Sequence, residues 1–397
     1  MGVGKFEVHL DHAQGVVAAG GQLVGCVVLQ LDKATKINTI KLRLEGKGKS
    51  WWDERHGRST TRYRAYESYI DYTVLLFSKS DTDESAMVPQ GDNTYPFTIQ
   101  LSPNLPCSFE GRRGHVRYTC KASLDRPWKF NESTKRAFTI IRHFDLNHIP
   151  TALMPVFAEQ RQSIEGCCCS AGDIEVSMGL NKTGYVPGEP ILYDINITNN
   201  SDNVIREAHL VLIQNVTYTG YSDSIFSSNK PHYHPKVDNF TLYHGKITCN
   251  KGTSFKVNQA CFVPSLPPSD LPGCNIIDIK YTVKLIVPCG MSTCKLVKPI
   301  LVGTIPINIP VVTPPTQSVE PTAPIEPPAY EAPPPSYSES VFGHVDVRDE
   351  NDDEHTSGNM NWAPAYIYYD WSQQGSQTLG NRSVDTAQLA PPAYNQI

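Results

Sequence analysis

The chain has no long hydrophobic run. Its apolar stretches, such as the one that ends at Phe77, are far shorter than the roughly 18 residues needed to span a membrane. A basic-then-apolar secretory leader is also missing, so we expect the protein to stay in the cytosol. Eleven cysteines in a long chain without a leader do not indicate a disulfide framework. These absences argue against secreted and membrane-spanning proteins.

The sequence also lacks the motifs of common enzymes. It contains no GxGxxG, GxSxG or HExxH, and Gly48-Lys49-Ser50 fails as a phosphate-binding loop because Arg43 replaces the first glycine. His232 and His234 have no third ligand nearby for a metal. We therefore expect neither catalysis nor a metal or cofactor. The net charge of −5, without basic residues interleaved with aromatics, also argues against a nucleic-acid partner.

Alternation of apolar and polar residues runs through most of the first 312 residues and predicts β-strands. Ile40, Leu42 and Leu44, for example, alternate with charged residues, which is typical of a half-buried strand. Similar stretches lie at residues 95–101, 116–124, 174–180, 191–197 and 277–287. Clusters of Gly, Pro, Asn and Asp separate them, and no convincing amphipathic helix is present. About 300 residues exceed one sandwich of seven to nine strands, so the pattern predicts an all-β fold of two consecutive sandwiches.

The composition changes near residue 313. Residues 313–397 contain 12 prolines and 12 acidic residues but only two basic ones, Arg348 and Arg382. Such a segment buries too little apolar surface to offset its ordering entropy, so we expect it to be disordered. The predicted organisation is a first sandwich over 5–148, a linker with a cysteine cluster over 149–171, a second sandwich over 172–312 and a disordered, acidic, Pro-rich tail over 313–397.

Three PPxY motifs in this tail are the most specific functional signal. They are Pro327-Pro328-Ala329-Tyr330, Pro334-Pro335-Ser336-Tyr337 and Pro391-Pro392-Ala393-Tyr394. Two prolines favour a polyproline II strand that fits an aromatic-lined groove, and the tyrosine adds an amphipathic anchor. The motifs predict binding to WW domains, and the first two are close enough to engage neighbouring WW domains together.

A basic segment is the second signal. Residues 112–142 contain nine Lys or Arg against Asp125 and Glu132. On the strand predicted there, Arg117 and Lys121 share one face, and Arg112 and Arg113 precede them. These four residues are candidates for contact with acidic or phosphorylated cargo, or with anionic lipid headgroups. An ordinary solvated face is the alternative, and we expect Arg126 to form a structural ion pair instead.

Cys167, Cys168 and Cys169 are adjacent in the predicted linker. They can be sites of acylation, or an inert cluster that is partly buried. Zinc binding is not expected, because the CxxC-type spacing of such sites is absent.

Several segments resemble the α-arrestins, the family of arrestin domain-containing proteins. The segment from Gly114 to Lys129, which reads GHVRYTCKASLDRPWK, is similar to the family pattern GxVRYxVKAxLDRPW. The turn GYVPGEP from Gly184, the cysteine triplet, and the late segment from Leu266 to Tyr281 also resemble the family. One departure is AAGGQ from Ala18, where relatives usually have Pro-Gly-Glu, although a glycine pair still supports a tight turn.

The resemblance implies two arrestin-like, immunoglobulin-type sandwiches and a non-enzymatic adaptor. Such an adaptor would bind the cytoplasmic tails of receptors or transporters and recruit WW-domain HECT-type ubiquitin ligases, promoting cargo ubiquitination, endocytosis and endosomal transport. It would be cytoplasmic, with recruitment to the plasma membrane and endosomes. Two other functions stay open from the sequence: a signalling or transcription regulator whose tail binds WW-domain co-activators, and a sandwich that carries a ligand.

Overall fold

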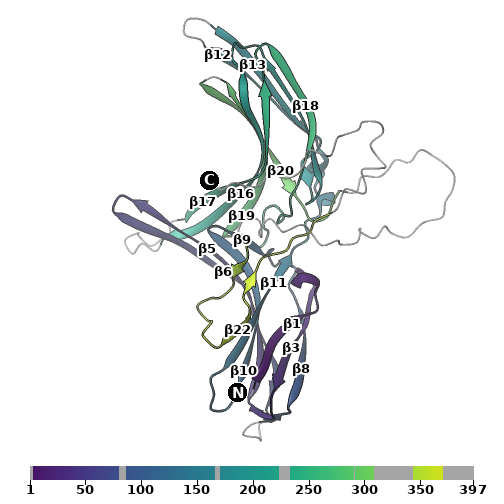
Figure 1. Ribbon diagram of the computed structural model, residues 1–397, viewed down its shortest axis with the longest axis vertical. Coiled ribbons are helices and arrows are strands. Elements are labelled where there is room, and N and C mark those ends of the chain that lie inside the picture. Colours follow the sequence, from purple (N-terminus) through teal and green to yellow (C-terminus); the bar gives the residue numbers. More distant parts are fainter. Residues whose placement is uncertain are drawn as a thin grey trace, which may run out of the picture.

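The computed structural model describes residues 3–79, 86–165, 170–222, 233–289, 291–307 and 343–369. Within these ranges the regular structure is strand, apart from three short 3-10 turns: η1 (Ala13–Gly15), η2 (Leu146–His148) and η3 (Pro150–Leu153). Two β-sandwiches follow one another along the chain and lie end to end in Figure 1. The predicted two-sandwich architecture is confirmed. In these ranges, no helix has the length and apolar character needed to cross a membrane.

The N-terminal sandwich has a small and a large layer. The small layer is an antiparallel sheet in the order β1 (Val3–Leu10), β3 (Gln22–Leu31) and β8 (Gly91–Gln100). The large layer contains β5 (Thr39–His56), β6 (Ser59–Ser78), β10 (Gly114–Asp125), β11 (Glu132–Ile141), β2 (Val16–Ala18) and β9 (Phe109–Gly111). A separate pair joins β4 (Thr35–Ile37) to β7 (Ala86–Val88).

The alternation of β10 explains how the large layer is oriented. Its apolar residues Val116, Tyr118, Cys120, Ala122 and Leu124 are all buried, because side chains two residues apart lie on the same face of a strand. The polar residues between them therefore project from the outer face of the sheet. This geometry places the basic side chains of neighbouring strands on one surface.

The C-terminal sandwich repeats this arrangement. One layer has the order β12 (Val156–Glu165), β13 (Ser170–Leu180), β15 (Pro190–Asn199) and β18 (Thr253–Phe262). The other contains β16 (Ile205–Ser222), β17 (Tyr233–Cys249), β19 (Ile277–Cys289), β20 (Ser292–Val302) and β14 (Gly184–Tyr185). The region expected as a linker, 149–171, differs from that expectation, since β12 pairs with β13 along nearly its whole length. The second sandwich thus begins about 16 residues earlier than predicted.

The two sandwiches share one sheet. Strand β16 pairs with β6 at Tyr221–Arg64 and Ser222–Tyr63, which joins the large layers of both sandwiches into a single 12-stranded sheet among the described residues. An ion pair between Arg113 Nε and Asp238 Oδ1, 2.9 Å long, also crosses the boundary.

Residues 343–369, hereafter the tail segment, are folded against the body. They form β21 (Val345–Asp346), β22 (Thr356–Asn359) and β23 (Asn361–Trp362), shown in yellow-green in Figure 1. Strands β21 and β23 pair with each other, and β22 adds in parallel to β11. The sequence predicted disorder for this part of the tail. The difference arises because its contacts are with distant parts of the chain rather than with its own neighbours.

Candidate functional site

The outer face of the large N-terminal layer is strongly basic. We call it the basic sheet face; it consists of the side chains of Lys41, Arg43, Lys47, Lys49, Arg117, Lys121 and Lys135 on β5, β10 and β11. Arg117 and Lys121 do lie on one face, as the period-two pattern predicted, because they alternate with buried Tyr118 and Cys120.

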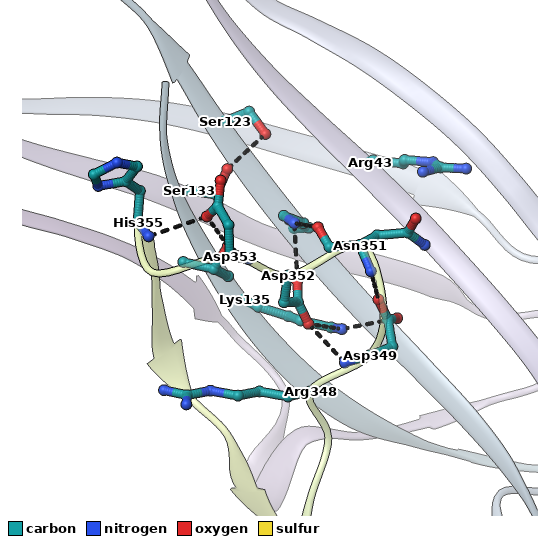
Figure 2. Close-up of polar contacts among 12 residues, drawn as sticks. Arg43, Ser123, Ser133, Lys135, Arg348, Asp349, Asn351, Asp352, Asp353 and His355 are labelled. Atoms are coloured by element: carbon teal, nitrogen blue, oxygen red, sulfur yellow. Dashed lines mark hydrogen bonds and ion pairs between the residues drawn. The ribbon is translucent and has the colours of Figure 1, made fainter. Parts of the chain in front are cut away.

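The tail segment covers part of this face. Strand β22 extends the sheet beyond β11, pairing Ser133–Arg136 with Thr356–Asn359, and the Ser133 amide donates to the His355 carbonyl at 3.1 Å. The acidic turn before β22 then lies over the neighbouring strands. Figure 2 shows Asp349 and Asp352 from this turn directed at Lys135.

Lys135 is the centre of the contact. Only 1% of this residue is exposed, although lysine is rarely buried without a partner. Its Nζ lies 2.6 Å from Asp352 Oδ2 and 3.1 Å from Asp349 Oδ2. Lys121 Nζ is 2.8 Å from the other carboxylate oxygen of Asp352 and donates to the Asn351 carbonyl, also at 2.8 Å. Two lysines and two aspartates thus form one partly desolvated network.

The network lowers the pKa values of both aspartates. Burial alone would raise the pKa of Asp352, but hydrogen bonds from Lys121 and Lys135 outweigh it, and the pKa falls below its ordinary value. For Asp349, burial likewise opposes the shift, while the Asn351 amide and Lys135 lower the pKa overall. Both carboxylates are therefore ionised at neutral pH, and the docked segment offers two negative charges to the basic sheet face.

Arg117 is already engaged by the body and by the tail. Its Nη2 donates to Glu110 Oε2 at 2.9 Å, and its Nη1 donates to the Asp346 carbonyl at 3.3 Å. Burial raises the pKa of Glu110, and the hydrogen bond from Arg117 only partly opposes this. The Arg117 guanidinium is therefore held in place by a buried carboxyl group and reaches the backbone of the tail segment.

The other residues predicted for anion contact lie apart from this network. Arg112 is exposed, whereas Arg113 is committed to Asp238 in the other sandwich. Arg126 is 5% exposed and pairs with Glu132, which confirms the predicted structural ion pair. Of the four candidates, then, only Arg117 and Lys121 come together, and both meet the tail segment.

The last residues of the tail segment bind both sandwiches. Tyr366 is 5% exposed, and its hydroxyl donates to the Ser108 carbonyl of the first sandwich at 3.2 Å. Ser265 Oγ of the second sandwich donates to the Tyr366 carbonyl at 3.3 Å. Tyr369 continues along the second sandwich, where its hydroxyl donates to the Thr304 carbonyl at 2.6 Å. Residues 366–369 therefore act as a staple across the domain boundary.

The remaining predicted site residues lie outside the described residues. These are the three PPxY motifs and the triplet Cys167–Cys169, so their roles stay predictions. Among the described residues, no three His, Cys, Asp or Glu side chains are grouped so that they could hold a metal ion.

Comparisons with known proteins agree with this architecture. Residues 6–147 match the family described as arrestin (or S-antigen), N-terminal domain, and residues 170–307 match the corresponding C-terminal domain. The chain is 30% identical over 315 residues to arrestin domain-containing protein 17 of Caenorhabditis elegans, an alignment covering 76% of this chain and 71% of the relative. The chain is an α-arrestin.

Two human relatives extend the similarity. Arrestin domain-containing protein 4 is 25% identical over 307 residues, with 75% of this chain and 70% of the relative aligned. Thioredoxin-interacting protein is 24% identical over 307 residues, covering 76% and 74%. The predicted family membership is confirmed, and the α-arrestin is an arrestin-type adaptor.

The sequence did not predict that the tail segment docks on the α-arrestin body. A signal was present in the charge asymmetry, because the acidic run from Asp349 to Glu354 complements the basic run between Arg112 and Arg142. From the sequence, the basic run alone predicts contact with an external anionic partner. The structure adds that the chain itself supplies one.

Proposed function

We propose that this α-arrestin links membrane-protein cargo to WW-domain HECT-type ubiquitin ligases, and thereby promotes cargo ubiquitination, endocytosis and endosomal transport. The observation that carries the proposal is the presence of three PPxY motifs on a chain with two arrestin domains. Each motif supplies a preformed polyproline strand and a tyrosine anchor, the features that WW domains recognise. The protein would work in the cytoplasm and on the cytoplasmic faces of the plasma membrane and endosomes.

The basic sheet face is the surface to which we propose that cargo binds. A cytoplasmic receptor segment with acidic or phosphorylated side chains would find the same lysines that now hold Asp349 and Asp352. Cargo at this site would then compete with the tail segment. Arg117 and Lys121, proposed from the sequence as anion contacts, are the residues that such cargo would reach once the acidic turn has left.

The proposed binding of the ligase is tested by calorimetric titration of a tandem WW-domain fragment into the full chain. Replacing Tyr330, Tyr337 and Tyr394 together with Ala should abolish binding, while Tyr72→Ala, at an exposed tyrosine of the body, should leave it unchanged. Loss of Tyr330 or Tyr337 alone should cost more than loss of Tyr394, because two motifs seven residues apart share an avidity gain that can reach about 100-fold.

Retention of near wild-type affinity by the triple variant would refute the proposed binding of the ligase.

Cell imaging separates the adaptor from a transcription regulator. Puncta at the plasma membrane and endosomes that disappear in the triple variant support the adaptor, whereas a nuclear pool that depends on the same tyrosines contradicts it.

A further inference from the structure

A small cavity lies where the tail segment meets the basic sheet face. Its volume is about 120 Å³, and we call it the seam cavity. Strands β5, β10 and β11 form one side, and Val347–Asp349 of the tail segment form the other. At about 30 Å³ per water molecule, it has room for a compact ion with a few oxygen atoms, but not for a peptide.

The lining of the seam cavity is cationic. Five basic side chains contribute to it: Lys47, Lys49, Arg117, Lys135 and Arg348. The lining contains only two carboxylates, and each already forms an ion pair with one of these cations. Glu45 pairs with Lys47 at 2.9 Å, and Asp349 pairs with Lys135 at 3.1 Å. Arg117 is paired with Glu110, which is not part of the lining, so the unpaired positive charge is that of Lys49 and Arg348, in a space that the tail segment partly screens from solvent.

Two cations and one imidazole are available to a ligand. Among the described residues, Lys49 and Arg348 have no ion pair; the contact of Lys49 is with the ring of Tyr66, 5.9 Å from Nζ. His115 is held neutral, because burial, Arg117 and Lys49 lower its pKa to about 2. Its Nδ1 is buried without a hydrogen-bond partner among the described residues. A neutral imidazole in a cationic pocket can donate one hydrogen bond to an anion.

We infer that the seam cavity binds one phosphate-sized tetrahedral oxyanion, and that the bound anion holds the tail segment onto the body. Lys49 and His115 supply the contacts from the body, and Arg348 supplies one from the tail. An anion with partners on both sides adds its binding free energy to the docked state only, since removal of the tail segment opens the site. This inference depends on the docked segment and is independent of the ligase proposal.

Trypsin provides a direct readout, because Arg348 and Arg382 are the only two Lys or Arg residues after residue 312. Cleavage after Arg348 of the full chain reports how often the segment opens when reclosing is fast. The probe is sodium phosphate, compared with sodium chloride at equal ionic strength, because salt alone weakens surface ion pairs. At ten times the dissociation constant, phosphate should slow cleavage about tenfold.

Matched variants identify the site. Lys49→Gln should remove most of this protection, while Lys41→Gln, at an exposed lysine of the same strand outside the cavity, should retain it. Calorimetry of phosphate binding to the wild-type chain gives a second measurement that does not require a variant to fold. The inference would be overturned if both variants were protected equally, or if phosphate gave no protection. Faster cleavage in phosphate would also overturn it, because it would show that the anion displaces the aspartates.

Discussion

Replacing Lys135 with methionine should release the tail segment while the sandwiches stay folded. Methionine is similar in length and leaves the outer sheet face intact, but it removes the ammonium group between Asp349 and Asp352. In the docked state this would leave Asp352, whose side chain is 2% exposed, with Lys121 as its remaining cation. Loss of one partner from a buried ion pair typically costs about 3–5 kcal/mol.

The chain can avoid that cost by undocking the segment, which returns both carboxylates to water. The cost therefore acts on the docking equilibrium rather than on global unfolding. At about 1.4 kcal/mol per factor of ten, 3–5 kcal/mol corresponds to a shift of roughly 10²-fold to a few thousand-fold toward the open state.

Hydrogen exchange measures this shift in the amides of β22, which pair with β11 only while the segment is docked. Lys135→Met should increase exchange there by the factor above, with unchanged exchange in β3. Lys41→Met provides the control, since Lys41 is exposed on the same face. If β22 exchanges equally slowly in both variants, the ion network does not hold the tail segment.

Further predictions concern the acid equilibria and the staple. Docking lowers the pKa values of Asp349 and Asp352, so docking is strongest above the free aspartate pKa of about 3.9. It should weaken as the pH falls through the lowered pKa values and both carboxylates become protonated. Hydrogen exchange in β22 should therefore become faster below about pH 4. Gly188→Ala should displace Tyr369, because Gly188 has φ +90° and an added Cβ would collide with the Tyr369 carbonyl. Protease mapping of this variant should then find cleavage near residue 369. Tyr366→Ala should loosen the staple, at a cost of about 3–5 kcal/mol shared between undocking and cavity formation, measured by the same exchange experiment.

The fold was predictable because one face of most strands is buried. Alternation in β10, β13 and β19 follows directly from this, so buried and outward positions could be assigned residue by residue. Strand β12 was missed because it is at the edge of its layer. It begins Val156-Phe157-Ala158 and continues with mostly polar residues, and Phe157 is 62% exposed, so its strand character comes from pairing with β13.

The tail segment was unpredictable for a related reason. Strand β22 reads Thr-Ser-Gly-Asn, which has little intrinsic preference for a strand, and its pairing partner lies more than 200 residues earlier. The ion pairs of Lys135 also join positions separated by more than 200 residues. Sequence patterns report local periodicity, so they identified the basic sheet face but not the segment that covers it.

The central claim of an adaptor is that one molecule holds cargo and ligase at the same time. Size-exclusion chromatography with light scattering can test this on the full chain mixed with a tandem WW-domain fragment and a multiply phosphorylated receptor-tail peptide. We predict a single ternary complex that loses the WW fragment in the triple tyrosine variant and loses the peptide on charge reversal of Arg117 and Lys121. Binding of the two ligands that is mutually exclusive, or a peptide that binds equally well after the charge reversal, would contradict it.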